Sequence, residues 1–234
     1  MHDSDDMDGV GPRESLRDWL HDRALTLVLL AMFGVSLMGQ FASGHREYNS
    51  TRLEHHQPSV SIWSYAVSGH WLESVFENWE SEFLQMAVFI LLTTVLVQKG
   101  SPESRRAHVK ELVDADPRDH ADDADAPWPV RRGGWILTLY ENSLGIAFLL
   151  LFVVSWAGHA AGGFLDSVEN AAMHGGTQPS FIDYLSSSRF WFESFQNWQS
   201  EFLSIAAMVW LAVYLRQRGS PESKPVHASH DDHD

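Results

Sequence analysis

Two glutamates in this chain, Glu82 and Glu201, occupy equivalent positions in a repeated pattern. Each follows an asparagine by four residues, Asn78 or Asn197, and this spacing places the two polar side chains on one face of a helix. Two carboxylates brought close together either share a proton or hold a cation. We therefore predict these four residues as candidates for ion or proton binding. The alternative is that they are acidic residues at a membrane–water interface.

Histidines form a second group that could do chemistry. His55 and His174 occupy matching positions near the acidic residues Glu54 and Glu169, and His159 lies in an apolar stretch. Imidazole nitrogens and carboxylate oxygens together bind divalent metals, so a divalent metal is the cofactor to consider. Further ligands in the same stretches are His56, Glu73 and Glu193. The sequence has no His-Glu-x-x-His or Glu-x-x-His pair, and a hydrogen-bonded interfacial histidine is the alternative for His159.

These candidates lie in two copies of one pattern, offset by 119 residues. Asn-Trp-Glu-Ser-Glu-Phe-Leu at 78–84 matches Asn-Trp-Gln-Ser-Glu-Phe-Leu at 197–203, and Gly-Ser-Pro-Glu-Ser occurs at 100–104 and 219–223. Tryptophan favours the membrane–water interface, and the Gly-Ser-Pro sequence is typical of a helix end and a turn. The expected structural anchors are Trp79, Trp198, Gly100, Gly219, Pro102 and Pro221.

Four apolar stretches must position these residues. Residues 24–42 and 143–161 are each long enough, at about 28 Å as a helix, to span a hydrocarbon core of about 30 Å. Residues 79–98 and 198–217 are also long enough once their polar beginnings are included. Lipid offers the backbone no hydrogen-bond partner, so each stretch must be helical. We predict an all-α fold, a four-helix transmembrane bundle of two parallel two-helix repeats with helical extracytoplasmic loops; a soluble bundle is the alternative.

The basic residues predict the orientation. All but three of the sixteen Lys and Arg residues lie outside the loops 43–78 and 162–197. Because cytoplasmic segments carry the excess of positive charge, we expect a protein of the cytoplasmic membrane with both termini in the cytoplasm. The expected organisation is a disordered acidic arm at 1–15, a membrane repeat at 16–106, a cytoplasmic acidic linker at 107–134, a second membrane repeat at 135–225 and a disordered His/Asp tail at 226–234.

Both repeats resemble a family of uncharacterised bacterial membrane proteins, whose members carry an Asn-Trp-Gln-Ser-Glu-Phe-Leu box and a Ser-Pro-Glu-Ser-Lys end. The resemblance covers residues 16–106 and 135–225. The first copy departs from the pattern with Glu80 in place of Gln and with Arg105 in place of Lys. The resemblance implies a multi-pass membrane location and this topology, and it implies no activity.

The amino-acid composition excludes some classes of partner and binding site. The net charge of −15 argues against a nucleic-acid partner, which needs a basic surface, and the sequence has no cysteine for disulfides or thiolate metal sites. No phosphate-binding glycine loop or catalytic triad pattern points to an enzyme.

We expect the lipid bilayer as partner, and a homo-oligomer if four helices are too few to enclose a path for an ion. The expected function is small cation or proton transport or a channel-like activity. The alternatives are a non-catalytic accessory or envelope-stress membrane protein and a metal-binding membrane enzyme or redox protein.

Overall fold

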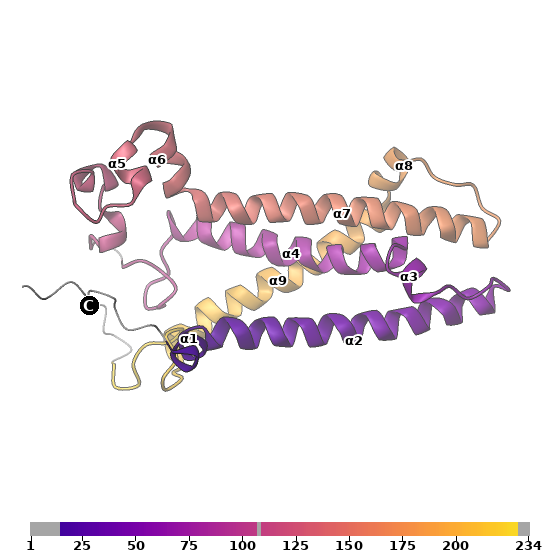
Figure 1. Cartoon of the computed structure of the whole chain (residues 1–234), viewed down its shortest axis with the longest axis horizontal. Helices are drawn as coiled ribbons and strands as arrows, with labels where there is room; N and C mark the ends of the chain where they lie inside the picture. Colours follow the sequence, from indigo (N-terminus) through magenta and orange to yellow (C-terminus); the bar gives the residue numbers. More distant parts are fainter. Residues whose placement is uncertain (1–14, 107–108, 229–234) are drawn as a thin grey trace, which may run out of the picture. The chain divides into compact units, whose positions relative to one another are not determined.

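The computed structural model describes residues 15–106 and 109–228, and within these residues all regular structure is helical (Figure 1). The chain divides into two compact units, residues 1–62 and 63–234. The α-helices are α1 Leu16–Asp22, α2 Ala24–Glu54, α3 Ile62–Tyr65, α4 Gly69–Thr93, α5 Trp128–Arg132, α6 Gly134–Glu141, α7 Ser143–Met173, α8 Phe181–Leu185 and α9 Ser188–Tyr214. The short 3-10 helices are η1 Leu112–Asp114 and η2 Pro117–His120.

The first unit consists of α1, the long helix α2 and the segment that follows α2. Ser15 caps the start of α1 through its side chain. After α2 the chain folds back on the helix end. The Asn49 Oδ1 accepts the N–H of Val60 at 2.7 Å, and the Arg52 Nε–H donates to the carbonyl of Pro58 at 2.9 Å. These bonds satisfy backbone groups in the loop that would otherwise lack partners.

The second unit is organised by three long helices. Helix α7 packs against α4 along much of its length, and α9 packs against α4 at an oblique angle (Figure 1). The short helix α8 contacts both α7 and α9, so it closes one end of the group. The buried cluster of Ala160, Tyr184 and Phe190 comes from α7, α8 and α9 in turn and holds that end together.

Glycines allow α4 and α7 to approach until their backbones touch. A Cβ atom on Gly162 of α7 would overlap the backbone of Leu72 and Glu73. A Cβ atom on Gly69 of α4 would overlap the backbone nitrogen of Asp166. Close approach of this kind brings short side chains on both helices within reach of each other.

The same helix bounds recur at an offset of 119 residues. Helices α2 and α7 each contain 31 residues, Ala24–Glu54 and Ser143–Met173. Helices α4 and α9 each begin after a serine, Ser68 and Ser187, whose hydroxyl accepts a backbone N–H of the first helical turn. Both of these N-cap residues stand at matching positions of the two sequence copies.

Among the described residues, α2 and α7 are long and apolar enough to cross a membrane. Helices α4 and α9 have 25 and 27 residues, which is also sufficient length, but their first halves carry several acidic side chains. The helices also differ in extent from the predicted spans. Helix α4 ends at Thr93 rather than at 98, and α9 ends at Tyr214 rather than at 217, because the chain turns before each Gly-Ser-Pro-Glu-Ser box.

Each Gly-Ser-Pro-Glu-Ser box forms a tight turn. Gly100 and Gly219 have φ values of 89° and 83°, as the sequence led us to expect for left-handed residues, although they lie several residues beyond the helix ends. The first serine of each box accepts the N–H of the glutamate, at 3.2 and 3.1 Å. No helix begins at either serine, so these serines close turns and do not cap a helix.

The segments predicted to be disordered are only partly described. Residues 109–134 of the acidic linker carry η1, η2 and α5, and α5 contacts both η2 and α6. Residues 1–14 of the N-terminal arm and 229–234 of the C-terminal tail lie outside the described residues.

Candidate cation site

Three glutamates of α4 form one side of a polar cluster inside the second unit. Glu73, Glu77 and Glu80 are spaced by four and three residues, so they lie on one face of the helix. Glu73 and Glu80 are buried, with 6% and 0% of their surface exposed. The serine cap fixes where α4 begins, and the glycine contact with α7 fixes its depth, so this acidic face meets α7 and α9.

The centre of the cluster is a buried pair formed by Glu80 and His159. His159 projects from α7, is 0% exposed, and its Nδ1 lies 2.9 Å from the Glu80 Oε2. The other Glu80 oxygen accepts the indole N–H of Trp198 at 3.0 Å. The ring of Phe190 covers the imidazole, with the ring centroids 4.9 Å apart. A carboxylate can only accept from the imidazole, so the hydrogen-bond pattern assigns the proton to Nδ1 and leaves the Nε2 lone pair unused when the ring is neutral.

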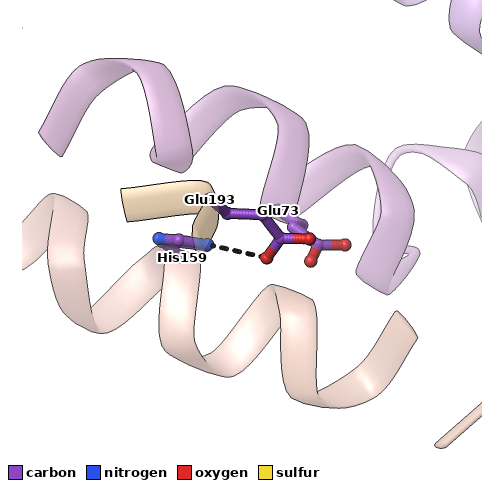
Figure 2. Close-up of side chains that lie close together, drawn as sticks. All are labelled: Glu73, His159 and Glu193. Atoms are coloured by element: carbon purple, nitrogen blue, oxygen red, sulfur yellow. Dashed lines mark ion pairs between the residues drawn. The ribbon is translucent and has the colours of Figure 1, made fainter. Parts of the chain in front are cut away.

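The unused nitrogen points at a second carboxyl group. The His159 Nε2 lies 3.7 Å from the Glu193 Oε2, which is too far for a hydrogen bond (Figure 2). Both atoms are buried and neither has a hydrogen-bond partner among the described residues. Buried polar atoms are nearly always paired, so two unpaired atoms that face each other mark an unusual place in the structure.

Arg189 joins the carboxyl groups on the outer side of the cluster. Its NH2 group donates to the Glu73 Oε1 at 2.9 Å and to the Asp166 Oδ2 at 3.1 Å, and its Nε–H donates to the Glu193 Oε1 at 2.8 Å. The Tyr184 hydroxyl also donates to the Glu73 Oε1, at 3.4 Å. The guanidinium therefore orients three carboxyl groups that come from α4, α7 and α9.

The environment of the outer carboxyl groups shifts their ionisation. Burial, together with the nearby charge of Asp166, raises the pKa of Glu73 to about 8. Burial disfavours the charged form of Glu193 as well, but the nearby His159 and the hydrogen bond from Arg189 outweigh it and lower the pKa of Glu193. Glu73 and Glu193 lie before the predicted membrane spans 79–98 and 198–217, respectively.

Three residues of the cluster could hold a metal ion. Glu73, His159 and Glu193 each offer one ligand atom, and these atoms all lie within 4.8 Å of one another (Figure 2). One imidazole nitrogen and two carboxylate oxygens form a donor set suited to divalent ions such as Zn²⁺ or Mn²⁺.

The predicted pair Glu82 and Glu201 lies on α4 and α9, which pack against each other, and the charge of Glu201 acts on Glu82. Beside them, the Gln85 side-chain N–H donates to the Glu201 carbonyl at 3.1 Å and to the Ser204 hydroxyl at 3.4 Å. Gln85 and Ser204 are themselves counterparts at the offset of 119. This pair lies further along α4 than the buried cluster, toward the apolar half of the helix.

The two predicted asparagines have different surroundings. Asn197 donates to the Glu77 Oε1 at 2.6 Å and so belongs to the edge of the cluster. Asn78 donates to the carbonyl of Ser74 within its own helix, at 2.8 Å. The predicted anchors also differ, because Trp198 binds Glu80 whereas Trp79 packs edge-on against the ring of Phe76, with 5.5 Å between centroids.

The predicted histidines also separate into two roles. His55 and His174 follow the last residues of α2 and α7, and each Nδ1 lies within hydrogen-bond distance of a carbonyl four residues earlier, at 2.9 and 2.8 Å. They complete helix ends in the same way in both copies. His159 instead meets Glu73 and Glu193, while the predicted ligands Glu54 and Glu169 are not part of that metal-binding group.

Several members of the cluster were absent from the sequence-based candidates. These are Glu77, Glu80, Asp166, Tyr184 and Arg189. Glu80 was noticed only as a departure from the usual box. A sequence signal did exist for the central pair, because the positions matching Glu80 and His159 in the other copy hold Gln199 and Gln40.

Comparison with known proteins gives one match. The family described as a domain of unknown function, DUF6766, matches residues 16–234. No curated protein and no solved structure matches the chain.

Proposed function

The chain belongs to the DUF6766 family of unknown function, and we propose that it is a multi-pass membrane protein that binds a cation among the buried carboxyl groups of α4, α7 and α9 and passes it across the membrane. The observation that carries this proposal is the charge of the cluster. Five carboxyl groups surround a single guanidinium and a single imidazole; they belong to Glu73, Glu77, Glu80, Asp166 and Glu193.

Such an excess of negative charge is costly inside a protein. Removing one carboxylate from water without a partner costs several kcal/mol, so a buried group of this kind must take up positive charge. Arg189 neutralises one carboxylate. The proton on Glu73, whose pKa is about 8, and a bound cation supply the remaining charge, and cation binding is the function that the geometry supports best.

The membrane architecture is part of the proposal. Two apolar helices of spanning length support it, and so does the recurrence of helix bounds at an offset of 119 residues. In two parallel repeats related by a twofold axis, residues on the axis contact their own counterparts. Gln85 contacts Ser204, and Glu82 interacts with Glu201, in each case at that offset. These contacts support two parallel two-helix repeats with the axis between α4 and α9.

The polar residues also suggest a route. From the start of α4 inward, the acidic face runs through Glu73, Glu77 and Glu80, and the pair Glu82 and Glu201 follows. Beyond Gln85 the helix is apolar as far as Thr93. We propose that a cation enters from the extracytoplasmic side, binds in the cluster and moves to the second pair of carboxyl groups.

The test is uptake into proteoliposomes that contain the purified full-length protein. Fluorescent indicators inside the vesicles report H⁺, K⁺ and Mn²⁺ in separate experiments. We expect flux of at least one cation, and at least a tenfold loss in the double variant Glu80→Gln/Glu193→Gln, which removes two carboxylates while keeping side-chain size. Glu141→Gln, at the exposed end of α6, is the control and should retain wild-type flux.

Vesicles that remain as impermeable as empty liposomes to all three ions would refute transport. Flux that is equal in wild type and in the double variant would show that the path lies elsewhere. Purified protein that stays in solution without detergent after ultracentrifugation would remove the membrane location itself.

A further inference from the structure

We infer that the cluster is a coordination site for one divalent transition-metal ion, with the His159 Nε2, the Glu193 Oε2 and a Glu73 carboxylate oxygen as its ligands. This inference deepens the proposed function, on which it rests for the role of the bound ion, by naming the class of cation. Four features of the site support the metal ion: two unpaired atoms, the distance between them, the hydrogen-bond partner of the histidine and the different residues at the equivalent positions of the repeat.

The first feature is the pair of unpaired buried atoms. His159 is completely buried, and its Nε2 points at the Glu193 Oε2 without making a hydrogen bond (Figure 2). A nitrogen lone pair and a carboxylate oxygen are both acceptors, so they repel each other unless something positive lies between them. A proton on the Nε2 would make the two atoms an ion pair, and a metal ion between them would bind both as ligands; their separation of 3.7 Å is longer than a hydrogen bond.

The separation of the two atoms suits a metal. Ligand distances of about 2.1 Å for both nitrogen and oxygen, typical of Zn²⁺, would place a 3.7 Å pair at an angle of about 120° around the ion. All three ligand atoms lie within 4.8 Å of one another, close to the span of about 4.2–4.4 Å between two ligands on opposite sides of such an ion.

The side chains that would hold the metal ligands in position already make the necessary hydrogen bonds. Histidines that bind metals usually donate their other ring N–H to a carboxylate, which fixes the tautomer and makes the binding nitrogen more basic. Glu80 accepts from the His159 Nδ1 in this way, at 2.9 Å, and Trp198 holds the other Glu80 oxygen at 3.0 Å. Arg189 binds the Oε1 atoms of Glu73 and Glu193, which leaves their Oε2 atoms available to an ion.

The number and type of ligands define the ion. Three protein ligands leave at least one position open to water or to a second ligand, as in sites that exchange or use their metal. The set has nitrogen and oxygen donors and no thiolate, since the chain has no cysteine. It therefore favours Zn²⁺, Mn²⁺, Co²⁺ or Fe²⁺ over soft ions such as Cu⁺.

The equivalent set of positions, at the offset of 119 residues, lacks this chemistry. The positions that match Glu73, Glu80, His159 and Glu193 hold Phe192, Gln199, Gln40 and Ser74. None of these side chains is ionisable, so the repeated helices form without them. The cluster therefore combines Glu73 and Glu80 of the first copy with His159 and Glu193 of the second, at one of two equivalent sets of positions, and the repeated pattern does not require it.

The experiment measures metal binding by the full-length protein in lipid nanodiscs. To remove adventitious sites, the C-terminal residues His227, His230 and His233 are replaced by alanine throughout. Zn²⁺ binding is followed by calorimetry, and Co²⁺ binding by its visible d–d absorption, which reports the ligand geometry. We expect one ion per chain.

Three variants assign the ligands. His159→Gln, which installs the residue found at the matching position of the other copy, should weaken Zn²⁺ binding by at least a hundredfold. Glu80→Gln should weaken Zn²⁺ binding by about 10–100-fold and keep one ion per chain, because Glu80 holds the His159 ring and does not bind the metal itself. His174→Gln, at the end of α7, is the control and should leave affinity unchanged. Glu193→Gln provides a second ligand variant if His159→Gln alters the melting temperature.

The outcomes separate this inference from the proposed transport. No stoichiometric binding, or binding that survives both ligand variants, would overturn the metal site. If ion flux persists unchanged in His159→Gln, transport stands and this site is wrong. If the metal binds as expected but no cation crosses the vesicle membrane, transport is wrong and the metal site stands, which would favour a metal-dependent membrane enzyme.

Discussion

The buried pair of Glu80 and His159 predicts a large coupling energy in a double-mutant cycle. The variants are Glu80→Leu, His159→Leu and the double variant, because leucine is close in volume to both residues and makes no hydrogen bond. All measurements are made at one pH and with a metal chelator present, so that only the protein's own interactions contribute.

The magnitudes follow from the two hydrogen bonds at Glu80. In His159→Leu the buried carboxylate keeps only the indole N–H of Trp198 among the described residues, and a buried charge that loses its partner costs about 3–5 kcal/mol. In Glu80→Leu the imidazole donor loses its partner, which costs about 1–3 kcal/mol, and the indole loses its acceptor as well. The double variant removes both members of the pair and leaves only the indole unsatisfied. Because the indole contribution cancels, the two single effects should together exceed the double effect by about 4 kcal/mol even at the lower ends of these ranges, which is above the roughly 0.5–3 kcal/mol usual for contacting residues.

The assay is unfolding of the purified protein in mixed micelles by increasing sodium dodecyl sulfate, followed by tryptophan fluorescence. Trp198 is itself bonded to Glu80, so its emission reports the site directly. The control cycle combines Glu80→Leu with His174→Leu on the same helix, about 22 Å from His159, and it should be additive within about 0.5 kcal/mol. Additivity within the same margin for Glu80 and His159 would refute the pairing on which the site is built.

Three further predictions follow from other parts of the second unit. Gly162→Ala should lower the free energy of unfolding by about 1–3 kcal/mol or more, because its Cβ overlaps the α4 backbone. Gly145→Ala on the same helix, whose Cβ would meet only a leucine side chain at 3.5 Å, should be neutral or stabilising by up to about 1 kcal/mol; thermal unfolding distinguishes the two. Burial and the facing carboxyl of Glu222 raise the pKa of Glu103 to about 7, above its ordinary value of 4.5, so the folded state binds this proton more tightly than the unfolded chain. Stability should therefore fall as pH rises from about 4.5 to about 7, and Glu103→Gln should remove that part of the slope in unfolding measured across this range. Arg189→Ala should lower stability by about 1–3 kcal/mol, because three carboxyl groups lose their shared, partly exposed donor, and denaturant unfolding would show it; an unchanged midpoint would contradict this.

The helices could be predicted from the sequence more closely at their starts than at their ends. The predicted spans at 24–42 and 143–161 begin where α2 and α7 begin, because the apolar runs start there. Both helices continue past those spans to Glu54 and Met173, where apolar periodicity no longer marks them. Their ends depend instead on local hydrogen bonds of the capping histidines, which hydropathy does not detect.

The candidate site was less accessible to sequence reasoning. Repetition pointed to Glu82 and Glu201, which lie on the packed helices α4 and α9, and their role in ion binding stays a prediction. The buried cluster could not be found in this way, because Glu80 and His159 are residues in which the copies differ. Recognising them as partners requires knowing that the second helix of one copy packs against the first helix of the other, which depends on backbone contact at the glycines.

This contrast separates the residues that build the fold from those that build the site. The serine caps of α4 and α9 and the glycine turns occur in both copies, as expected for features that every copy needs in order to fold. A charged cluster inside a helix bundle is costly, and the equivalent set of positions holds uncharged side chains, so the repeated pattern gives no structural reason for the charges. Glu80 of the first copy and His159 of the second contact each other and stand where the equivalent positions hold two glutamines, so a ligand and its supporting carboxylate lie at a single place. Such a paired difference, with one residue from each copy, is the pattern expected when a duplicated scaffold acquires a binding site at one of its two equivalent sets of positions.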